Sequence, residues 1–128
     1  MAIRILIADD NKALRKELRH ALDNYDSWAV CAEADDGQQA VWKTQEARPD
    51  IVILDLAMPV MNGLQACREI KQILPAVPVF IYTAYDSVSV EWEARQAGAR
   101  AVIQKGWPIE SLISTVEKRL ASRTVGTT

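Results

Sequence analysis

The chain of 128 residues contains no apolar run long enough to cross a bilayer. Its first residues, MAIRILIADD, also lack the pattern of a signal peptide, because the apolar stretch is short and ends in two acids. We therefore expect a cytoplasmic protein without a membrane span. An excess of positive charge is missing too: the formal net charge is −2, so no basic field indicates direct binding to nucleic acid or to an anionic membrane.

Cysteine and histidine are scarce. Cys31 and Cys67 have no metal-ligand spacing, and in a reducing compartment we expect two small, buried apolar side chains rather than a disulfide. The single histidine, His20, lies among charged residues of a predicted helix, so we expect it in solvent and not as a ligand or a phosphodonor. Neither residue type therefore indicates a site.

Apolar runs alternate along the chain with segments of helical period, and no internal repeat is present. The runs at 3–8, 28–34, 51–54, 77–82 and 99–103 predict strands, and the segment after each of them predicts a helix. Such βα units predict an α/β fold with a parallel sheet and helices on both faces. We expect one domain over residues 1–121 and a polar, disordered tail over residues 122–128.

The segment 87–97 has an ambiguous period, since Val88, Val90, Trp92 and Ala94 alternate as they would in a strand. Its length and the strands on either side favour a helix. If Val90 and Ala94 face inward, Val88 and Trp92 lie one turn apart and form an exposed apolar patch for a partner. The opposite choice of inward face is about equally supported by the pattern.

Chemically active side chains follow four of the predicted strands: Asp9 and Asp10, Asp55, Thr83 and Lys105. Because the carboxyl ends of parallel strands lie at one edge, we expect these side chains to converge. Carboxylates bind Mg²⁺ together with water and phosphate oxygens, and a carboxylate can attack phosphorus to give an aspartyl-phosphate. A lysine supplies positive charge to phosphoryl oxygens, and a hydroxyl can hydrogen-bond them. The pattern indicates phosphoryl chemistry.

Taken singly, each of these residues has an ordinary structural interpretation. An aspartate after a strand is more often a helix cap, a lysine is more often a solvated charge, and a threonine is more often a turn hydroxyl. An adjacent acid pair is a less usual cap, because the two charges repel. Four strand ends that all carry site-type groups are hard to obtain by chance, so we favour the joint site.

At these residues the sequence resembles the response-regulator receiver family of two-component signalling, whose fold is that of the chemotaxis receiver. The resemblance runs from Ile3 to about Leu120 and is carried by the motifs ILIADDN, DIVILDLAMPVMNG, YTA and AGARAVIQK. It implies a doubly wound, flavodoxin-like (βα)5 domain whose five-stranded parallel sheet has the order 2-1-3-4-5.

The resemblance also implies a role for each site residue. Asp55 would be the phosphoacceptor, and Lys105 would pair with the phosphoryl group. Mg²⁺ would be bound by Asp10, by Asp55 and by the main-chain carbonyl of Ala57, with Asp9 orienting the ion through water.

Three positions depart from the family pattern. Thr83 would turn towards the phosphoryl group on activation, usually together with an aromatic residue three positions before the lysine, but Val102 stands there. The usual aromatic readout is therefore not expected. Gly106 follows the lysine where the family often has proline, and Asn62 replaces a common acid, from which we expect little effect.

The function implied is a switch rather than a turnover enzyme. A sensor histidine kinase or a phosphotransfer protein would donate the phosphoryl group, and an unidentified output domain or protein, often in transcription regulation, would respond. Homodimerisation through the fourth or fifth helix is common in the family, but no decisive signature of it is present.

Two alternatives share part of this pattern. A phosphohydrolase of the haloacid-dehalogenase kind would carry D-x-D at the first strand and a substrate-covering cap, whereas this chain has adjacent acids and no room for a cap. A phosphorylation-independent interaction module on the same fold is motivated by Val102.

Overall fold

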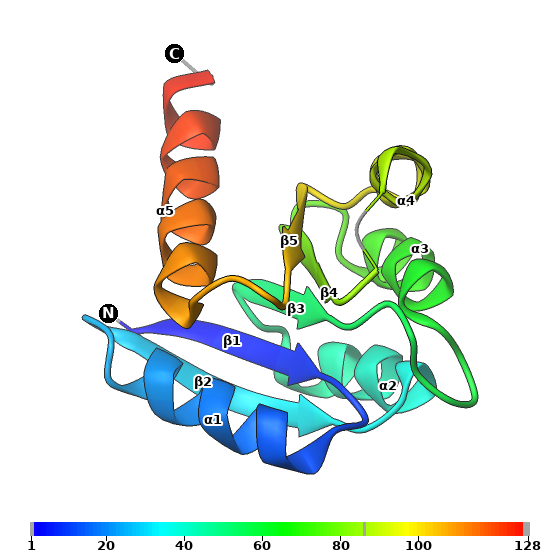
Figure 1. Ribbon diagram of the computed structural model, residues 1–128, viewed down its shortest axis with the longest axis horizontal. Helices are drawn as coiled ribbons and strands as arrows, with labels where there is room; N and C mark the ends of the chain where they lie inside the picture. Colours follow the sequence, from blue (N-terminus) through cyan, green and yellow to red (C-terminus); the bar gives the residue numbers. More distant parts are fainter. Residues whose placement is uncertain (1, 86, 127–128) are drawn as a thin grey trace.

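The computed structural model describes residues 2–85 and 87–126, with side chains described as far as Leu120. It contains a parallel sheet in the order β2-β1-β3-β4-β5, which confirms the predicted fold class and strand order (Figure 1). The strands are β1 (Ile3–Ala8), β2 (Trp28–Ala34), β3 (Ile51–Leu54), β4 (Val79–Thr83) and β5 (Ala101–Gln104).

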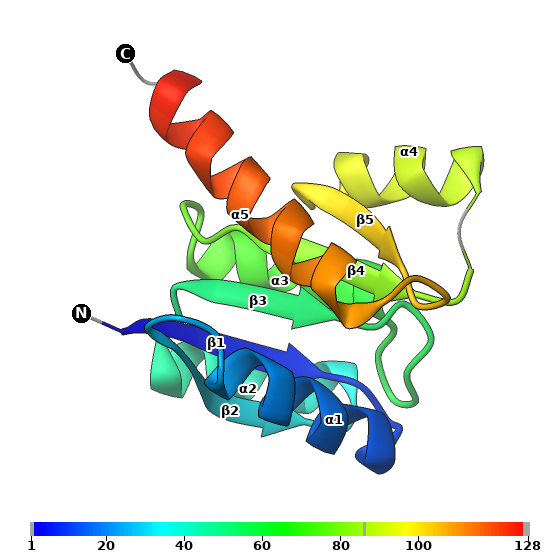
Figure 2. The ribbon, with the colours of Figure 1, turned by 60° about the vertical axis from the view of Figure 1, so that its left-hand side comes forward.

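Helices cover both faces of this sheet (Figures 1 and 2). They are α1 (Lys12–Asp23), α2 (Gly37–Ala47), α3 (Gly63–Ile73), α4 (Val88–Gln96) and α5 (Ile109–Gly126). Buried residues of α1 and α5 share one core cluster, and buried residues of α2, α3 and α4 share the other. Strands between two helical layers must be apolar on both sides, which explains why the central strand β3 is buried at every position.

Four helices begin at a side chain that caps them. Asn11, Asp36, Asn62 and Ser87 each accept a hydrogen bond from the main-chain N–H three residues on, at 2.8–3.2 Å. These caps satisfy N–H groups that have no partner within the helix. Each capped start directs α1, α2, α3 or α4 away from the carboxyl edge of the sheet, and this edge is therefore built from strand ends and short loops.

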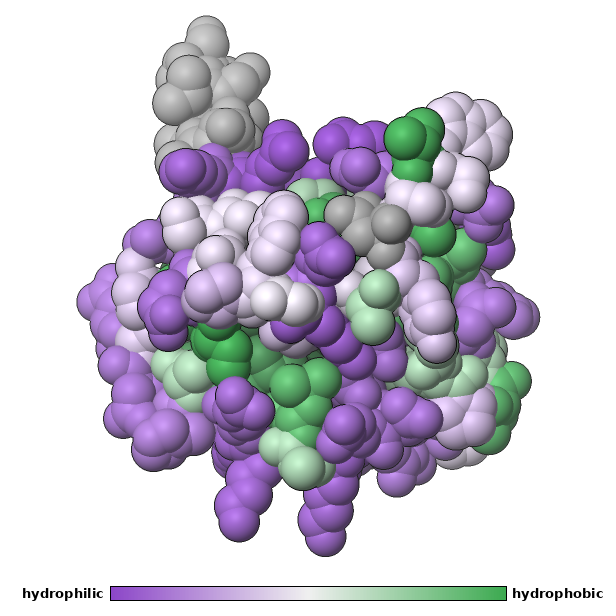
Figure 3. Space-filling view, viewed as in Figure 1, coloured by the Kyte–Doolittle hydropathy of each residue, from purple (hydrophilic) through white to green (hydrophobic). Residues whose placement is uncertain are grey.

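The segment 87–97 is helical, and its predicted inward face is confirmed. Ala94 is fully buried, whereas Val88 and Trp92 are 85% and 63% exposed. Apolar surface is visible over α4 at the upper right of the space-filling view (Figure 3). The exposed pair therefore forms the expected apolar patch on the outside of α4.

Several boundaries differ from the sequence prediction. β4 and β5 each begin two residues later than predicted, because Val77 and Ala99 donate their N–H groups to turns, to the carbonyls of Leu74 and Ala94. Helix α5 extends to Gly126, so part of the predicted tail is helical. Residues 127 and 128 lie outside the described residues, and the division at residue 121 stays a prediction.

Both cysteines are free thiols, as predicted, but only Cys67 is buried; Cys31 is half-buried, so its predicted burial was wrong. Burial raises the pKa of Cys67 to about 11. His20 is exposed, as expected. None of the helices in the described part of the chain has the length and apolar character that a membrane span requires.

Candidate functional site

The three acids predicted at the strand ends lie together. β1 and β3 pair with Ala8 opposite Leu54, so the residues that follow these two strands are neighbours. Asp9, Asp10 and Asp55 each offer a carboxylate oxygen within 4.8 Å of the other two. Asp9 and Asp55 are 2% and 5% exposed, whereas Asp10 is exposed.

Lys105 lies against two of these carboxylates. Its Nζ is 2.7 Å from Asp9 Oδ2 and 3.3 Å from Asp55 Oδ2. The position follows from the sheet, because the Lys105 N–H donates to the Thr83 carbonyl at 2.9 Å and extends the pairing of β5 with β4. A single ammonium therefore bridges the ends of β1 and β3 from the far side of β4.

The charges of the site are not balanced within the chain. Burial, together with the neighbouring Asp9 carboxylate, raises the pKa of Asp55, and Lys105 offsets only part of this effect. Burial lowers the pKa of Lys105, but the carboxylates of Asp9 and Asp55 outweigh burial and raise it. The site therefore holds an ammonium that stays charged and an excess of negative charge.

Thr83 is fully buried at the end of β4. Its Oγ1 accepts a hydrogen bond from the Tyr85 N–H at 3.0 Å, which is the turn role that a threonine commonly has here. The hydroxyl proton is still available as a donor. In this structure Thr83 Oγ1 therefore holds the loop after β4 through the Tyr85 N–H. Its hydroxyl proton could still be donated to a phosphoryl oxygen.

Residues that the sequence pattern did not indicate hold Asp9 in place. The Asn11 N–H donates to Asp9 Oδ1 at 2.9 Å, and Arg15 Nη1 donates to the Asp9 carbonyl at 2.6 Å. Arg15 is itself paired with Glu33, at 3.2 Å. Only the folded contact of α1 with β2 identifies these partners, because no spacing of Arg15 and Glu33 in sequence indicates them.

Two glycines close the loop between β3 and α3 against the site. A Cβ on Gly63 would lie 2.1 Å from the Asp55 carbonyl oxygen, and a Cβ on Gly37 would lie 2.1 Å from the Met61 carbonyl oxygen. The Gly63 N–H donates to the Leu56 carbonyl at 2.8 Å. Only glycine permits these backbone approaches, so the loop that begins at Asp55 also ends beside it.

The donor set fits Mg²⁺. The three acids supply the hard oxygen ligands that this ion prefers, and their number exceeds what Lys105 can neutralise. Asp9 Oδ2 is buried and forms an ion pair with the Lys105 ammonium. Within the described residues it accepts no hydrogen bond. Ala57, whose carbonyl is the fourth predicted ligand, is exposed in the loop after Asp55.

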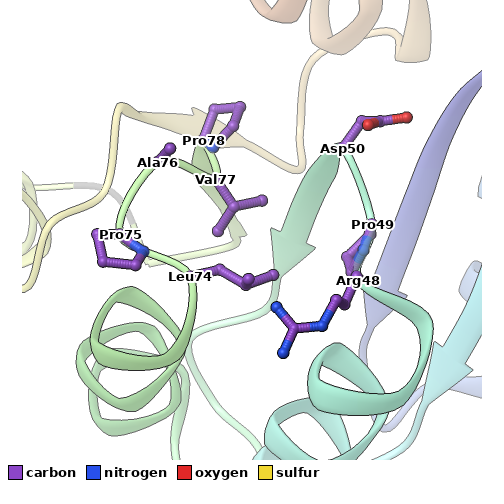
Figure 4. A pocket seen from close by; sticks show the side chains of 8 residues that line it. All are labelled: Arg48, Pro49, Asp50, Leu74, Pro75, Ala76, Val77 and Pro78. Carbon is purple, nitrogen blue, oxygen red and sulfur yellow. The ribbon is translucent and has the colours of Figure 1, made fainter.

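A hollow of about 360 Å³ lies at the other edge of the sheet, where β3 and β4 begin (Figure 4). Its lining consists of Arg48, Pro49, Asp50 and residues 74–78, between the ends of α2 and α3. None of the site residues lines it, so the acid cluster is a separate feature.

A family model described as the response regulator receiver domain matches residues 5–117. The chain belongs to the response regulator receiver family. Its fold, its acid cluster and its lysine agree with this membership, and the resemblance seen in the sequence motifs is confirmed.

Among relatives of this receiver domain, response regulator MprA of Mycolicibacterium vanbaalenii is 35% identical over 124 residues, which are 97% of this chain and 53% of the relative. MprA of Mycobacterium tuberculosis is 34% identical over 120 residues, 94% of this chain and 51% of the relative. The chain thus spans about half the length of these curated relatives.

Solved structures agree. A LuxR-family two-component response regulator from Aurantimonas has a TM-score of 0.90 and 31% identity, over 95% of this chain and 87% of that chain. The signal receiver domain of the regulator NarL from Mycobacterium tuberculosis has a TM-score of 0.86 and 27% identity, over 91% and 94%.

A receiver domain of this family is the phosphoacceptor switch of a two-component system. Receiver domains typically act as signalling switches rather than as turnover enzymes. Nothing in these comparisons favours the phosphorylation-independent module.

Proposed function

We propose that Asp55 accepts a phosphoryl group from the phosphohistidine of a sensor histidine kinase or a phosphotransfer protein, in a reaction that requires Mg²⁺. The observation that carries the proposal is the contact of Lys105 with both Asp9 and Asp55, at the edge where the third acid, Asp10, also lies. A lone capping aspartate needs no such countercharge.

In the proposed reaction an Asp55 carboxylate oxygen forms a bond to phosphorus while the bond from phosphorus to the donor imidazole nitrogen breaks. The electron pair of that bond leaves with the imidazole. Asp10, Asp55 and the Ala57 carbonyl would hold Mg²⁺, with Asp9 orienting it through water. The bound ion supplies positive charge to the phosphoryl oxygens. Lys105 is the second source of positive charge, because its ammonium already lies 3.3 Å from Asp55.

Thr83 is proposed as the group that reports phosphorylation. Its hydroxyl lies at the end of β4 and can exchange the Tyr85 N–H contact for a bond to a phosphoryl oxygen. Val102, half-buried on β5, cannot supply the swing of an aromatic ring, so we expect the signal to travel through the loop after β4.

The output belongs to the rest of a longer regulator or to a separate protein. One structural relative is titled a DNA-binding response regulator of the LuxR family from Staphylococcus aureus, with 28% identity and a TM-score of 0.85 over 91% of this chain and 98% of that chain. We propose a role in transcription regulation on this analogy, with no nucleic acid bound by this chain itself. A cytoplasmic location and homodimerisation through α4 or α5 are further proposals.

The test is the intact mass of the protein after incubation with acetyl phosphate and Mg²⁺. We expect the wild type to gain one phosphoryl group, and Asp55→Asn or the wild type with excess chelator to gain none. Lys105→Ala should remain folded and be labelled roughly a hundredfold more slowly, the lower end of the loss when a group that stabilises transition-state charge is removed. Equal labelling of the wild type and Asp55→Asn would place the phosphoacceptor elsewhere.

A further inference from the structure

A charged side chain holds the peptide group between Asp9 and Asp10. Arg15 Nη1 donates a hydrogen bond to the Asp9 carbonyl oxygen at 2.6 Å. This bond also fixes the nitrogen of Asp10, because the carbonyl of one residue and the N–H of the next lie in one planar group. Asp9 is held separately on its other sides, by its N–H on the Ala34 carbonyl at 3.0 Å and by the Asn11 N–H on its carboxylate at 2.9 Å. Arg15 therefore fixes the direction in which the chain leaves Asp9.

The position of Asp10 depends on this direction. Asp10 is exposed, and its carboxylate forms no hydrogen bond or ion pair with any residue that the structure describes. It nevertheless offers an oxygen within 4.8 Å of those of Asp9 and Asp55. Because no partner holds this side chain, the main chain before it decides where the carboxylate lies. A rotated peptide between Asp9 and Asp10 would therefore move Asp10 away from Asp55.

Glu33 on β2 holds Arg15 in place. Glu33 Oε1 lies 3.2 Å from Arg15 Nε, and the Arg15 side chain is only 14% exposed. The planar guanidinium can bind the carboxylate with one nitrogen and the Asp9 carbonyl with another, which a single ammonium nitrogen does less well. Arg19 Nη1 lies 2.6 Å from the other carboxylate oxygen of Glu33. Two arginines of α1 thus contact one acid of β2, the strand beside which α1 lies (Figure 1).

The simpler interpretation of Arg15 is a contact that attaches α1 to the sheet. Arg19 provides the same attachment through the same acid, at a shorter distance. Only Arg15 also reaches the Asp9 carbonyl. The two arginines therefore differ in their contact with the site and share their contact with Glu33, so their variants can separate the two roles.

We infer that Arg15, held by Glu33, is a positioning residue for Mg²⁺: it fixes the peptide between Asp9 and Asp10 so that Asp10 faces Asp55, and it thereby sets the affinity of the site for the ion. This inference rests on the proposed function and extends it to a residue outside the acid cluster. Arg15 contacts neither the ion nor the phosphoryl group, and the chemistry at Asp55 does not depend on it once the ion is bound.

The first measurement is the Kd for Mg²⁺ in the absence of any phosphodonor. MgCl2 is titrated into the wild type and its variants, and the Kd is taken from the NMR chemical shifts of the main-chain amides. For Arg15→Ala we expect a Kd roughly tenfold higher, the lower end of the loss when a residue that supports a metal ligand is removed. Arg15→Lys keeps a charged donor for the Asp9 carbonyl and should have a lower Kd than Arg15→Ala.

The second measurement is the rate of labelling by acetyl phosphate as a function of Mg²⁺ concentration. For Arg15→Ala the half-saturating Mg²⁺ concentration should rise by the same factor as the Kd. The rate at saturating Mg²⁺ should stay within twofold of the wild type. General damage to the fold would lower the saturating rate instead.

Arg19→Ala is the matched control, because it removes the other arginine from Glu33 and leaves the Asp9 contact in place. Its Kd for Mg²⁺ should stay within twofold of the wild type. Melting curves in chelator confirm that both alanine variants are folded at the temperature of the titration.

Four results would overturn the inference. They are an equal Kd for the wild type and Arg15→Ala, an equal rise in Kd for Arg15→Ala and Arg19→Ala, a Kd for Arg15→Lys as high as that for Arg15→Ala, and a lower saturating rate with an unchanged half-saturating concentration. A wild type whose spectrum does not respond to Mg²⁺ at all would instead contradict the proposed function.

Discussion

At the carboxyl edge of the sheet the chain buries Asp9 and Asp55 beside one ammonium, whereas the hollow at the amino edge is lined by the buried residues Val77 and Pro78 and lies beside paired backbone groups. There the Arg4 N–H donates to Asp50 Oδ2 at 2.8 Å, and the Asp50 N–H returns a bond to the Arg4 carbonyl at 2.8 Å. Polar groups at the amino edge thus satisfy one another, while those at the carboxyl edge carry unbalanced charge.

The two edges also differ in how they use the left-handed backbone. Arg48 at the amino edge has φ +45° and ends α2, and its N–H donates to the Thr44 carbonyl at 2.9 Å. Val60 at the carboxyl edge has φ +68° and lies in the loop between β3 and α3, not at the end of a helix. The left-handed residue at the amino edge thus ends a helix, and the one at the carboxyl edge lies between two buried methionines, Met58 and Met61. The two edges therefore differ in their charge and not in whether they contain a left-handed residue.

Gly63→Ala should have the largest effect, at the carboxyl edge. The added methyl group would lie 2.1 Å from the Asp55 carbonyl oxygen, and backbone atoms cannot yield as a side chain does. We expect a loss of about 3 kcal/mol in the free energy of unfolding, the upper end for overpacking, measured by urea denaturation. Gly106→Ala is the matched control, since nothing lies within 4 Å of its added methyl group. Equal stability of the two variants would mean that the loop relaxes freely.

Asp55→Asn should have the next largest effect, with the opposite sign. In a chelator at pH 7 we expect the variant to be about 1 kcal/mol more stable, the usual scale of one polar substitution. Burial and Asp9 raise the pKa of Asp55 above its ordinary 3.8, so in the window above pH 3.8 the native state binds more protons than the unfolded state. The contribution of Asp55 to the free energy of unfolding of the wild type therefore decreases as pH rises from 3.8 and becomes constant above the raised pKa of Asp55 in the native state.

A pH series of melting curves in chelator checks this sign. The difference between Asp55→Asn and the wild type should be small below pH 3.8, should grow as pH rises through the window, and should then stay constant. A variant that is less stable than the wild type at pH 7 would show that Lys105 stabilises the Asp55 carboxylate more than burial destabilises it.

Arg48→Gly, at the amino edge, should have the smallest effect on stability. Glycine removes the left-handed strain at the end of α2 but loses backbone entropy, and the difference should stabilise the chain by about 0.5 kcal/mol. Labelling by acetyl phosphate and by a kinase should stay at the wild-type level, since Arg48 lies at the amino edge. The melting temperature checks the predicted gain in stability, and the rate of phosphoryl labelling checks that the site is unaffected. A change in the labelling rate would show that the amino edge influences the site at the carboxyl edge.

The sequence allowed nearly the whole architecture to be predicted, because apolar runs and helical spacing are local signals. The helix over 87–97 was the hardest case, and the burial of Ala94 with Val88 exposed resolved the ambiguous period. The late start of β5 was missed because the Ala99 N–H turns back to the Ala94 carbonyl, and no composition signal marks that bond.

For the site, the strand ends indicated Asp9, Asp10, Asp55 and Lys105, since parallel strands place their carboxyl ends together. The residues that support them escaped prediction. Arg15 donates to the Asp9 carbonyl while it is paired with Glu33 of β2, and the left-handed Val60 lies between the buried residues Met58 and Met61. The ion pair with Glu33 and the burial of the two methionines depend on the tertiary fold, which a local pattern does not contain.

The closed loop between Asp55 and Gly63 also has an evolutionary consequence. Its two ends touch, so an inserted or deleted residue would move either the phosphoacceptor position or the first turn of α3. Exchanges of the exposed side chains in this loop should therefore be tolerated better than a change in its number of residues. The length of the loop is set by the backbone contact of Gly63 with Asp55.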